Sequence, residues 1–407
     1  MKKIIEKNTL SLFPLLFVSY EMATCLSNDA YLPALPAMMK DLSTTHYLAQ
    51  LTLTAWFLGY ALLQLFLGPI ADRFGRRNTL LFGSVIAIIA TMGCALSTSI
   101  HQLLFFRLLQ GMMVGTMSIP GYATVHELYT PNEAIKKLAF MKGIFILAPA
   151  FGPLFGSAIL TMASWRIIFA ITAAGTILSA VGLFFIMPET CPIEKRHPLH
   201  LLNTLSGYKK IIFNRHFIML TISACCLYGA MIAWITAGPF LIISTFHYGP
   251  FGFGIAQCFI FGAFIVGTKL THRLLDQHGA KNIVKRTISI ALISCFIALI
   301  ASFLFPYSLS LLVVFMMIIS TTAGICSPIL NRKAIESSQE KMGLKVTLYG
   351  FMTAVFGSSA SALISGFYNE KITSLISILF FLIVIAFTFA IISAQLGLLN
   401  EAKNDIR

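Results

Sequence analysis

The sequence predicts an all-α membrane protein with twelve transmembrane helices in two pseudo-symmetric six-helix halves. The 407 residues are 57% hydrophobic and only 11% charged, whereas soluble domains carry about 25% charged residues. Twelve successive stretches are apolar enough, and at about 20 residues long enough, to cross a bilayer. The longest polar stretch, residues 189–215, follows the sixth of them and divides the chain into six plus six.

The predicted spans of the first half are 9–32, 47–69, 78–97, 101–125, 138–161 and 165–187, and those of the second half are 217–245, 250–271, 287–305, 307–331, 346–367 and 373–399. Because the ninth and tenth are separated mainly by Pro306, eleven spans remain an alternative. We expect an N-terminal half over 1–190, a cytoplasmic linker over 191–215 and a C-terminal half over 216–407.

The positive charges indicate the orientation. If the N-terminus is cytoplasmic, 24 of the 29 lysines and arginines fall in cytoplasmic segments and only Lys40, Arg166 and Lys371 in periplasmic ones. Lysine and arginine are enriched on the cytoplasmic side of membrane proteins. Both termini then lie in the cytoplasm, which requires an even number of spans. Topology therefore accounts for the net charge of +14, and no nucleic-acid partner is needed.

Two carboxylates lie in the first predicted span. A charge at the bilayer centre costs about 2.5–3.5 kcal/mol even on the lenient insertion scale, so acids inside membrane helices are candidates for proton or substrate binding. Glu21 is near the midpoint of 9–32. Asp29 follows about 12 Å nearer the periplasm and about 80° around the helix. One cavity could contact both, and we expect at least one of them to couple transport to protons.

Arg107, about six residues into the fourth span, is the strongest intramembrane cation of the sequence. Its depth is close to that of Asp29, which predicts a direct or water-mediated contact between the two side chains. Gln110, one turn deeper on the same helix face, is a second candidate partner of Asp29. A bracing arginine without a role in proton coupling is the alternative.

The residues Gly68-Pro-Ile-Ala-Asp-Arg-Phe-Gly-Arg-Arg77 join the second and third spans. Glycine permits a tight backbone here, and a charge cluster at the helix ends could hold the cytoplasmic face in one state. The candidate gating residues are Gly68, Asp72, Arg73, Gly75 and Arg76. This pattern resembles the signature loop of the major facilitator superfamily. Arg107-Leu-Leu-Gln-Gly111 and Met187-Pro-Glu-Thr190 resemble two further motifs of that family.

The fifth span carries Ala148-Pro-Ala-Phe-Gly-Pro-Leu-Phe-Gly156. Pro149 and Pro153 permit bending, and Gly152 and Gly156 form a small-residue face that allows close helix approach. The Gly-Pro-x-x-Gly setting is similar to the motif of the drug:proton antiporters of this superfamily, which implies export.

Within that group the first span resembles the MdfA-like and bicyclomycin-resistance exporters, through Tyr20-Glu21 and Asn28-Asp29-Ala-Tyr-Leu-Pro-Ala-Leu-Pro36. In the MdfA type the two acids serve proton and cationic-drug recognition. The implied proton-coupling residues are Glu21, Asp29 and Arg107. The expected substrate-binding residues are Tyr20, Asn28, Asp29, Gln110, Tyr122, Met141, Ala150 and Trp234. Cys25 and Lys142 depart from the MdfA pattern, which puts the same drug range in doubt.

The resemblance implies a proton-coupled antiporter that exports lipophilic, often cationic, drugs across the bacterial inner membrane by alternating access. A dedicated exporter of an endogenous metabolite such as a siderophore is the main alternative, and a cavity-facing Lys142 would favour it. The fifth-span pattern argues against proton-coupled uptake. The sequence shows no motif of an enzyme, a cofactor site or a metal site. The expected partners are a small molecule, protons and lipid, and the expected state is a monomer.

Overall fold

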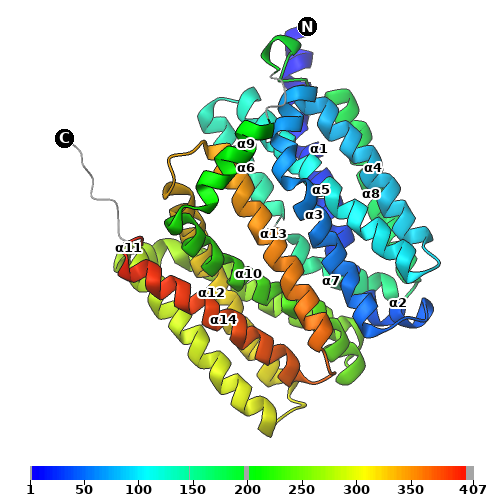
Figure 1. The fold of residues 1–407 in the computed structure, drawn as a ribbon. Helices are drawn as coiled ribbons and strands as arrows, with labels where there is room; N and C mark the ends of the chain where they lie inside the picture. Colours follow the sequence, from blue (N-terminus) through cyan, green and yellow to red (C-terminus); the bar gives the residue numbers. More distant parts are fainter. Residues whose placement is uncertain (1, 146, 197–200, 400–407) are drawn as a thin grey trace. The chain divides into compact units, whose positions relative to one another are not determined.

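The computed structural model describes residues 2–145, 147–196 and 201–399, and in these ranges the chain forms helices and turns without a strand. It divides into two compact units, Met1–Leu201 and Leu202–Arg407. Figure 1 shows the helices of each unit in sequence colours. The predicted all-α membrane fold is confirmed.

In the first unit, α5 packs against both α3 and α4, and α8 packs against both α1 and α4. The helix α1 also contacts α5, α6 and α7. The elements of this unit are α1 (Lys2–Asp29), η1 (Leu32–Ala34), α2 (Leu35–Asp41), α3 (His46–Phe74), α4 (Arg76–Leu96), α5 (Ile100–Leu128), α6 (Pro131–Phe145), α7 (Leu147–Leu160), α8 (Trp165–Ile186) and η2 (Ile193–Lys195).

In the second unit, α10 packs against α12, α13 and α14, while α11 packs against α12 and α14. The segment η3 is a π-helix that continues α10 beyond Pro239. The elements are α9 (Leu201–Ile212), α10 (Arg215–Pro239), η3 (Phe240–Thr245), α11 (Gly249–Leu304), α12 (Leu309–Glu336), α13 (Met342–Phe367) and α14 (Ile372–Gln395).

Polar side chains cap several of these helices. Thr45, Ser99 and Ser164 accept hydrogen bonds from backbone N–H groups in the first turns of α3, α5 and α8. Asn214 and Ser308 do the same for α10 and α12. A cap satisfies a backbone donor that has no partner inside the helix. The sequence thus marks the start of the helices as well as their apolar bodies.

Eleven helices among the described residues are long and apolar enough to cross a membrane. The remaining predicted span, 9–32, corresponds to α1, which ends at Asp29 and is followed by the short helix η1. The chain turns between Leu304 and Leu309, so Pro306 separates two helices and the continuous alternative is wrong.

Two polar stretches that we interpreted as connecting loops contain helix. Between the eighth and ninth predicted spans the chain stays helical except at Gly279, whose φ of 69° breaks α11. The predicted linker contains α9. The described contacts at the end of this linker lie within the second unit, since Asn214 donates to the carbonyl of Ser337 at 3.0 Å and Lys210 lies 3.5 Å from Glu340. Hydropathy reports membrane burial, and a polar stretch outside the membrane can still be helical.

Candidate functional site

Both acids of α1 are buried inside the first unit. Glu21 is 1% exposed and Asp29 is 8% exposed. The hydroxyl of Tyr122 on α5 donates a hydrogen bond of 3.1 Å to Oε2 of Glu21. A carboxylate in a membrane helix therefore faces a polar partner on a neighbouring helix, as is typical of functional acids in membranes.

Arg107 on α5 is fully buried and lies at the centre of a polar cluster. Its Nη1 donates to Oε1 of Gln110 at 2.6 Å, and its Nε lies 3.4 Å from the carbonyl oxygen of Thr52 on α3. The guanidinium carbon is 4.2 Å from the ring centroid of Tyr31. A cation over an aromatic face gains additional stabilisation when it is desolvated. The cluster thus holds the guanidinium from several sides.

Gln110 extends this cluster to two further helices. Its Nε2 donates to Ser27 Oγ on α1 and to Thr91 Oγ1 on α4, both at 2.9 Å. Gln110 is 1% exposed, so its amide would be costly to bury without partners. We expected Gln110 to be a second partner of Asp29, whereas its described hydrogen bonds go to Arg107, Ser27 and Thr91.

Asn28 connects Arg107 to Asp29. Nη2 of Arg107 donates to Oδ1 of Asn28 at 2.5 Å, and Nδ2 of Asn28 lies 3.4 Å from Oδ1 of Asp29. We expected Arg107 and Asp29 to meet directly or through water, whereas the described contacts run through the Asn28 amide. The reason is rotation along α1, because successive helical residues point about 100° apart.

The small residues of α7 allow that helix to approach the end of α1. A Cβ at Gly156 would lie 1.7 Å from the carbonyl oxygen of Ala30, and one at Gly152 would lie 2.8 Å from Cβ of Asp29. Both distances are too short for a real side chain. The structure thus shows the close helix approach that the glycine spacing predicts, and it occurs at Asp29.

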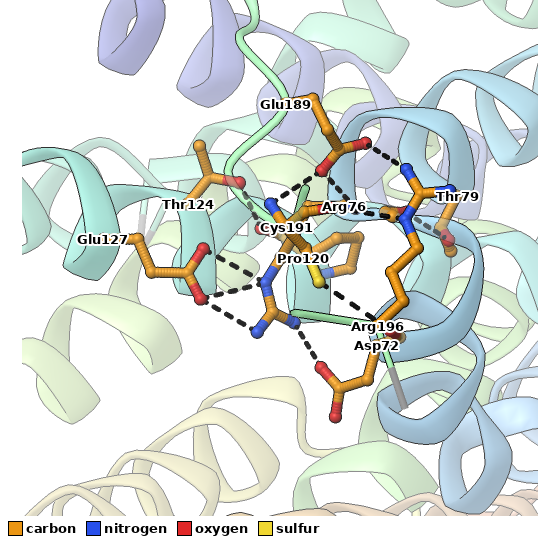
Figure 2. A network of polar contacts seen from close by, with 10 residues as sticks. Asp72, Arg76, Thr79, Pro120, Thr124, Glu127, Glu189, Cys191 and Arg196 are labelled. Atoms are coloured by element: carbon orange, nitrogen blue, oxygen red, sulfur yellow. Dashed lines mark hydrogen bonds and ion pairs between the residues drawn. The ribbon is translucent and has the colours of Figure 1, made fainter. Parts of the chain in front are cut away.

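The loop between α3 and α4 forms a second polar cluster (Figure 2). Two acids approach the guanidinium of Arg76 from different sides. Nη1 lies 3.0 Å from Oδ1 of Asp72, and Nη2 donates to Oε1 of Glu127 at 2.9 Å. Asp72 belongs to α3 and Glu127 to the end of α5, so Arg76 connects the ends of three helices.

Glu189, which follows α8, contacts the start of α4. Its Oε1 accepts from the backbone N–H of Arg76 at 2.9 Å and from that of Cys191 at 3.0 Å. A carboxylate at a helix N-terminus is stabilised by the free N–H groups and the helix dipole. Gly75 has a φ of 95°, and a Cβ there would lie 2.3 Å from Oε2 of Glu189. Glycine is therefore required both by the backbone and by the close carboxylate.

The next predicted residues are not members of the clusters around Arg107 and Arg76 described above. Tyr20, Met141 and Ala150 are buried in the first unit. Pro149 and Pro153 both lie in α7. Trp234 belongs to the second unit, is fully buried and donates to Oε1 of Gln257 at 2.7 Å.

Three predicted positions remain outside these clusters. A Cβ at Gly68 would meet no atom within 4 Å. Arg73 is exposed, and its guanidinium carbon lies 5.5 Å from the ring centroid of Phe74. The side chain of Lys142 lies outside the described part of the molecule.

Sequence reasoning missed several members of both clusters. Near Arg107 they are Ser27, Tyr31, Thr52 and Thr91, and near Arg76 they are Glu127, Cys191 and Arg196. Small hydroxyl residues are frequent in membrane helices, so nothing singles them out in the sequence. Glu127 had a usable signal, since it is one of only 15 acids in the chain.

No group of three or more histidine, cysteine or acidic side chains is placed to hold a metal ion in the described residues. In the described part of the first unit, hydrogen bonds between helices join buried carboxylates, amides and a guanidinium. Such an arrangement suits binding and proton exchange.

Comparison with known proteins identifies the family. Residues 18–362 match the Major Facilitator Superfamily model. Multidrug transporter MdfA of Yersinia pestis (strain Angola) is 32% identical over 274 residues, 67% of each chain. Multidrug resistance protein MdtM of Escherichia coli (strain K12) is 29% identical over 295 residues, 72% of each. Chloramphenicol resistance protein CraA of Acinetobacter baumannii is 29% identical over 339 residues, 83% of this chain and 81% of that one.

The fold is also that of a solved transporter. A bacterial homolog of the human lysosomal transporter Spinster, in an inward-facing and unoccupied conformation, superimposes with a TM-score of 0.70 at 15% identity over 96% of each chain. The predicted resemblance is confirmed, and so is the prediction of a transporter rather than an enzyme. The chain belongs to the Major Facilitator Superfamily and is a multi-pass transporter of the bacterial inner membrane.

Proposed function

We propose that the chain is a proton-coupled antiporter that exports lipophilic, often cationic, drugs by alternating access, with both termini in the cytoplasm. The observation that carries the proposal is the burial of Glu21 and Asp29 on one membrane helix, each beside a hydrogen-bonding side chain of the same unit. The similarity to MdfA, MdtM and CraA supports drugs as substrates.

In the proposed cycle, protons and substrate bind alternately, and Glu21 and Asp29 carry the protons. Facing the cytoplasm, Glu21 and Asp29 release protons as a lipophilic cation binds. The loaded transporter then faces the periplasm, where protons return and displace the substrate. The driving force is adequate, because one pH unit provides about 1.36 kcal/mol per proton and a potential of about 100 mV adds about 2.3 kcal/mol per charge.

Arg107 has a supporting part in this proposal. Its contact with Asn28 fixes a positive charge one residue away from Asp29. Glu21, in contrast, accepts a hydrogen bond from the neutral hydroxyl of Tyr122. The two acids thus differ in their described hydrogen-bond partners.

The experiment is transport in liposomes with an imposed pH gradient. Purified protein receives a panel of cationic, neutral and anionic compounds, one of them a siderophore, and internal pH is recorded. Several unrelated lipophilic cations should evoke proton movement, and the Glu21→Gln/Asp29→Asn double variant should abolish it. A response only to one anionic or metal-chelating compound would replace drug export by dedicated export of a metabolite.

A further inference from the structure

The second unit contains a cavity of about 580 Å³ between the two parts of α11 and the facing side of α12. This volume is within the range of about 300–1,000 Å³ typical of small-molecule sites. Its walls are mainly aliphatic, for example Ile290, Val314 and Ile318, and Ile290 and Val314 are themselves exposed. The cavity is therefore an apolar groove that opens on the outer surface of the helices.

The groove is elongated along the membrane direction. On α12 its wall extends from Val314 to Ile325, eleven residues or about 16 Å of helix. A groove of this form fits an extended hydrocarbon chain better than a compact solute.

One end of the groove is cationic. Arg286 and His278 line it on either side of Gly279, where α11 breaks. Arg286 is exposed and makes no hydrogen bond or ion pair with the described residues. It lies seven residues beyond Gly279, about 10 Å along the helix. Its long side chain can therefore extend toward the polar end of the groove while its stem stays in apolar surroundings.

The segment around this end of the groove is also positively charged. Between residues 269 and 286 a single acid, Asp276, accompanies five cations, Lys269, Arg273, Lys281, Lys285 and Arg286. Asp276 precedes His278 by two residues and so points about 200° away from it around the helix. A positive end joined to a long apolar groove is complementary to an amphiphile with an anionic head.

We propose that this groove binds an anionic phospholipid of the cytoplasmic leaflet, with its phosphate at Arg286 and His278 and one acyl chain along α12. The proposal takes the Gly279 turn to face the cytoplasm, as the lysine and arginine distribution predicts, and it does not depend on what the transporter exports. Basic pockets between membrane helices on the cytoplasmic side bind anionic head groups in this way. A lipophilic cation is disfavoured by Arg286, and free phosphate would leave the apolar length of the groove unused.

The test uses delipidated full-length protein in detergent with an equal mixture of phosphatidylglycerol and phosphatidylethanolamine of identical acyl chains. Bound lipids are counted by native mass spectrometry. We expect phosphatidylglycerol to be preferred about fivefold, the factor that corresponds to about 1 kcal/mol for one interfacial arginine. Arg286→Gln should remove the preference. Val314→Trp, which narrows the apolar part, should lower the occupancy by both lipids.

The matched control is Lys285→Gln, because Lys285 is the exposed neighbour of Arg286 and does not line the groove. It should keep the fivefold preference. Equal lipid binding by the wild type and Arg286→Gln would overturn the proposal. Displacement of the lipid by glycerol phosphate would indicate an ion site, and displacement by tetraphenylphosphonium would indicate a substrate site. Loss of lipid with formation of a dimer would assign the groove to a second copy of the chain. Each of these three results would contradict the proposal that a phospholipid occupies the groove.

Discussion

Arg107 donates a 2.5 Å hydrogen bond to the side-chain oxygen of Asn28, a residue 79 positions earlier in the chain. This contact ties α5 to the end of α1 next to Asp29. It makes Asn28, which the sequence suggests only as a substrate contact, a structural partner of the buried cation.

Asn28→Ala should therefore destabilise the protein. The change removes the acceptor of a buried guanidinium, and hydrogen bonds to charged groups contribute about 1.5–3 kcal/mol. Thermal unfolding in detergent measures the effect. Thr24→Ala is the matched control, because Thr24 is buried one turn earlier and the described hydrogen bond of its hydroxyl goes to its own helix, at the carbonyl of Tyr20. Equal losses in the two variants would contradict a special role of the Arg107–Asn28 contact.

Gly156→Ala should separate α7 from the end of α1. The added Cβ would lie 1.7 Å from the carbonyl oxygen of Ala30, and overpacking of this kind costs about 1–3 kcal/mol. Gly143→Ala, in the same predicted span, meets no atom within 4 Å. It should be neutral or stabilise by about 0.5–1 kcal/mol, since alanine favours helix. Thermal unfolding of both variants decides the matter, and a stable Gly156→Ala would show that the close approach is dispensable.

Glu189→Gln should loosen the segment that follows α8. The neutral side chain loses its ion pair with Arg196, whose Nη2 lies 3.8 Å from Oε2 of Glu189. It also loses its attraction to the N-terminus of α4, worth about 0.3–1 kcal/mol at a helix end. The thiol of Cys191, now 8% exposed and directed at the carbonyl of Asp72, should react faster with a maleimide. Site-resolved mass spectrometry measures the rate.

The control for Glu189 is Glu194→Gln, an exposed acid of the same segment. It should leave the labelling rate of Cys191 unchanged. If both variants, or neither, accelerate the reaction, the carboxylate of Glu189 does not hold this segment.

The carboxylate of Asp41 should contribute to the stability of the fold in a pH-dependent way. The hydrogen bonds donated by Arg166 and Trp165 hold the pKa of Asp41 below its ordinary value. A lowered folded pKa stabilises the protein above the unfolded value of about 3.9, and this stabilisation disappears as the pH falls through the folded pKa. The wild type should therefore melt above Asp41→Asn at neutral pH, and the gap should close in acid. A gap that does not narrow as the pH falls below about 3.9 would refute this assignment.

The sequence locates the main parts of the first unit because depth in a membrane follows from residue count. The positions of Asp29 and Arg107 along their spans predicted a similar depth for both, and the glycine spacing predicted a close helix approach, which α7 makes at the end of α1. Rotation of a helix about its axis and the path of a loop are not encoded so directly. Asn28 rather than Asp29 meets Arg107 because of the rotation of α1, and Glu189 reaches Arg76 because of the path after α8.

The helix break at Gly279 shows what hydropathy alone does not predict. Residues 272–286 are polar, so we expected a loop, yet the chain remains helical on both sides of one glycine. The apolar pattern reports where the membrane ends, whereas local propensity and a single residue with positive φ decide where the helix ends.

Proton release on substrate binding tests the central claim most directly. Purified protein in a weakly buffered detergent solution is mixed with a lipophilic cation, and the pH is followed. The wild type and the surface control Glu194→Gln should release protons when the cation binds, while Glu21→Gln/Asp29→Asn should release none. If the double variant binds the same cation and releases as many protons as the wild type, Glu21 and Asp29 are not the coupling acids.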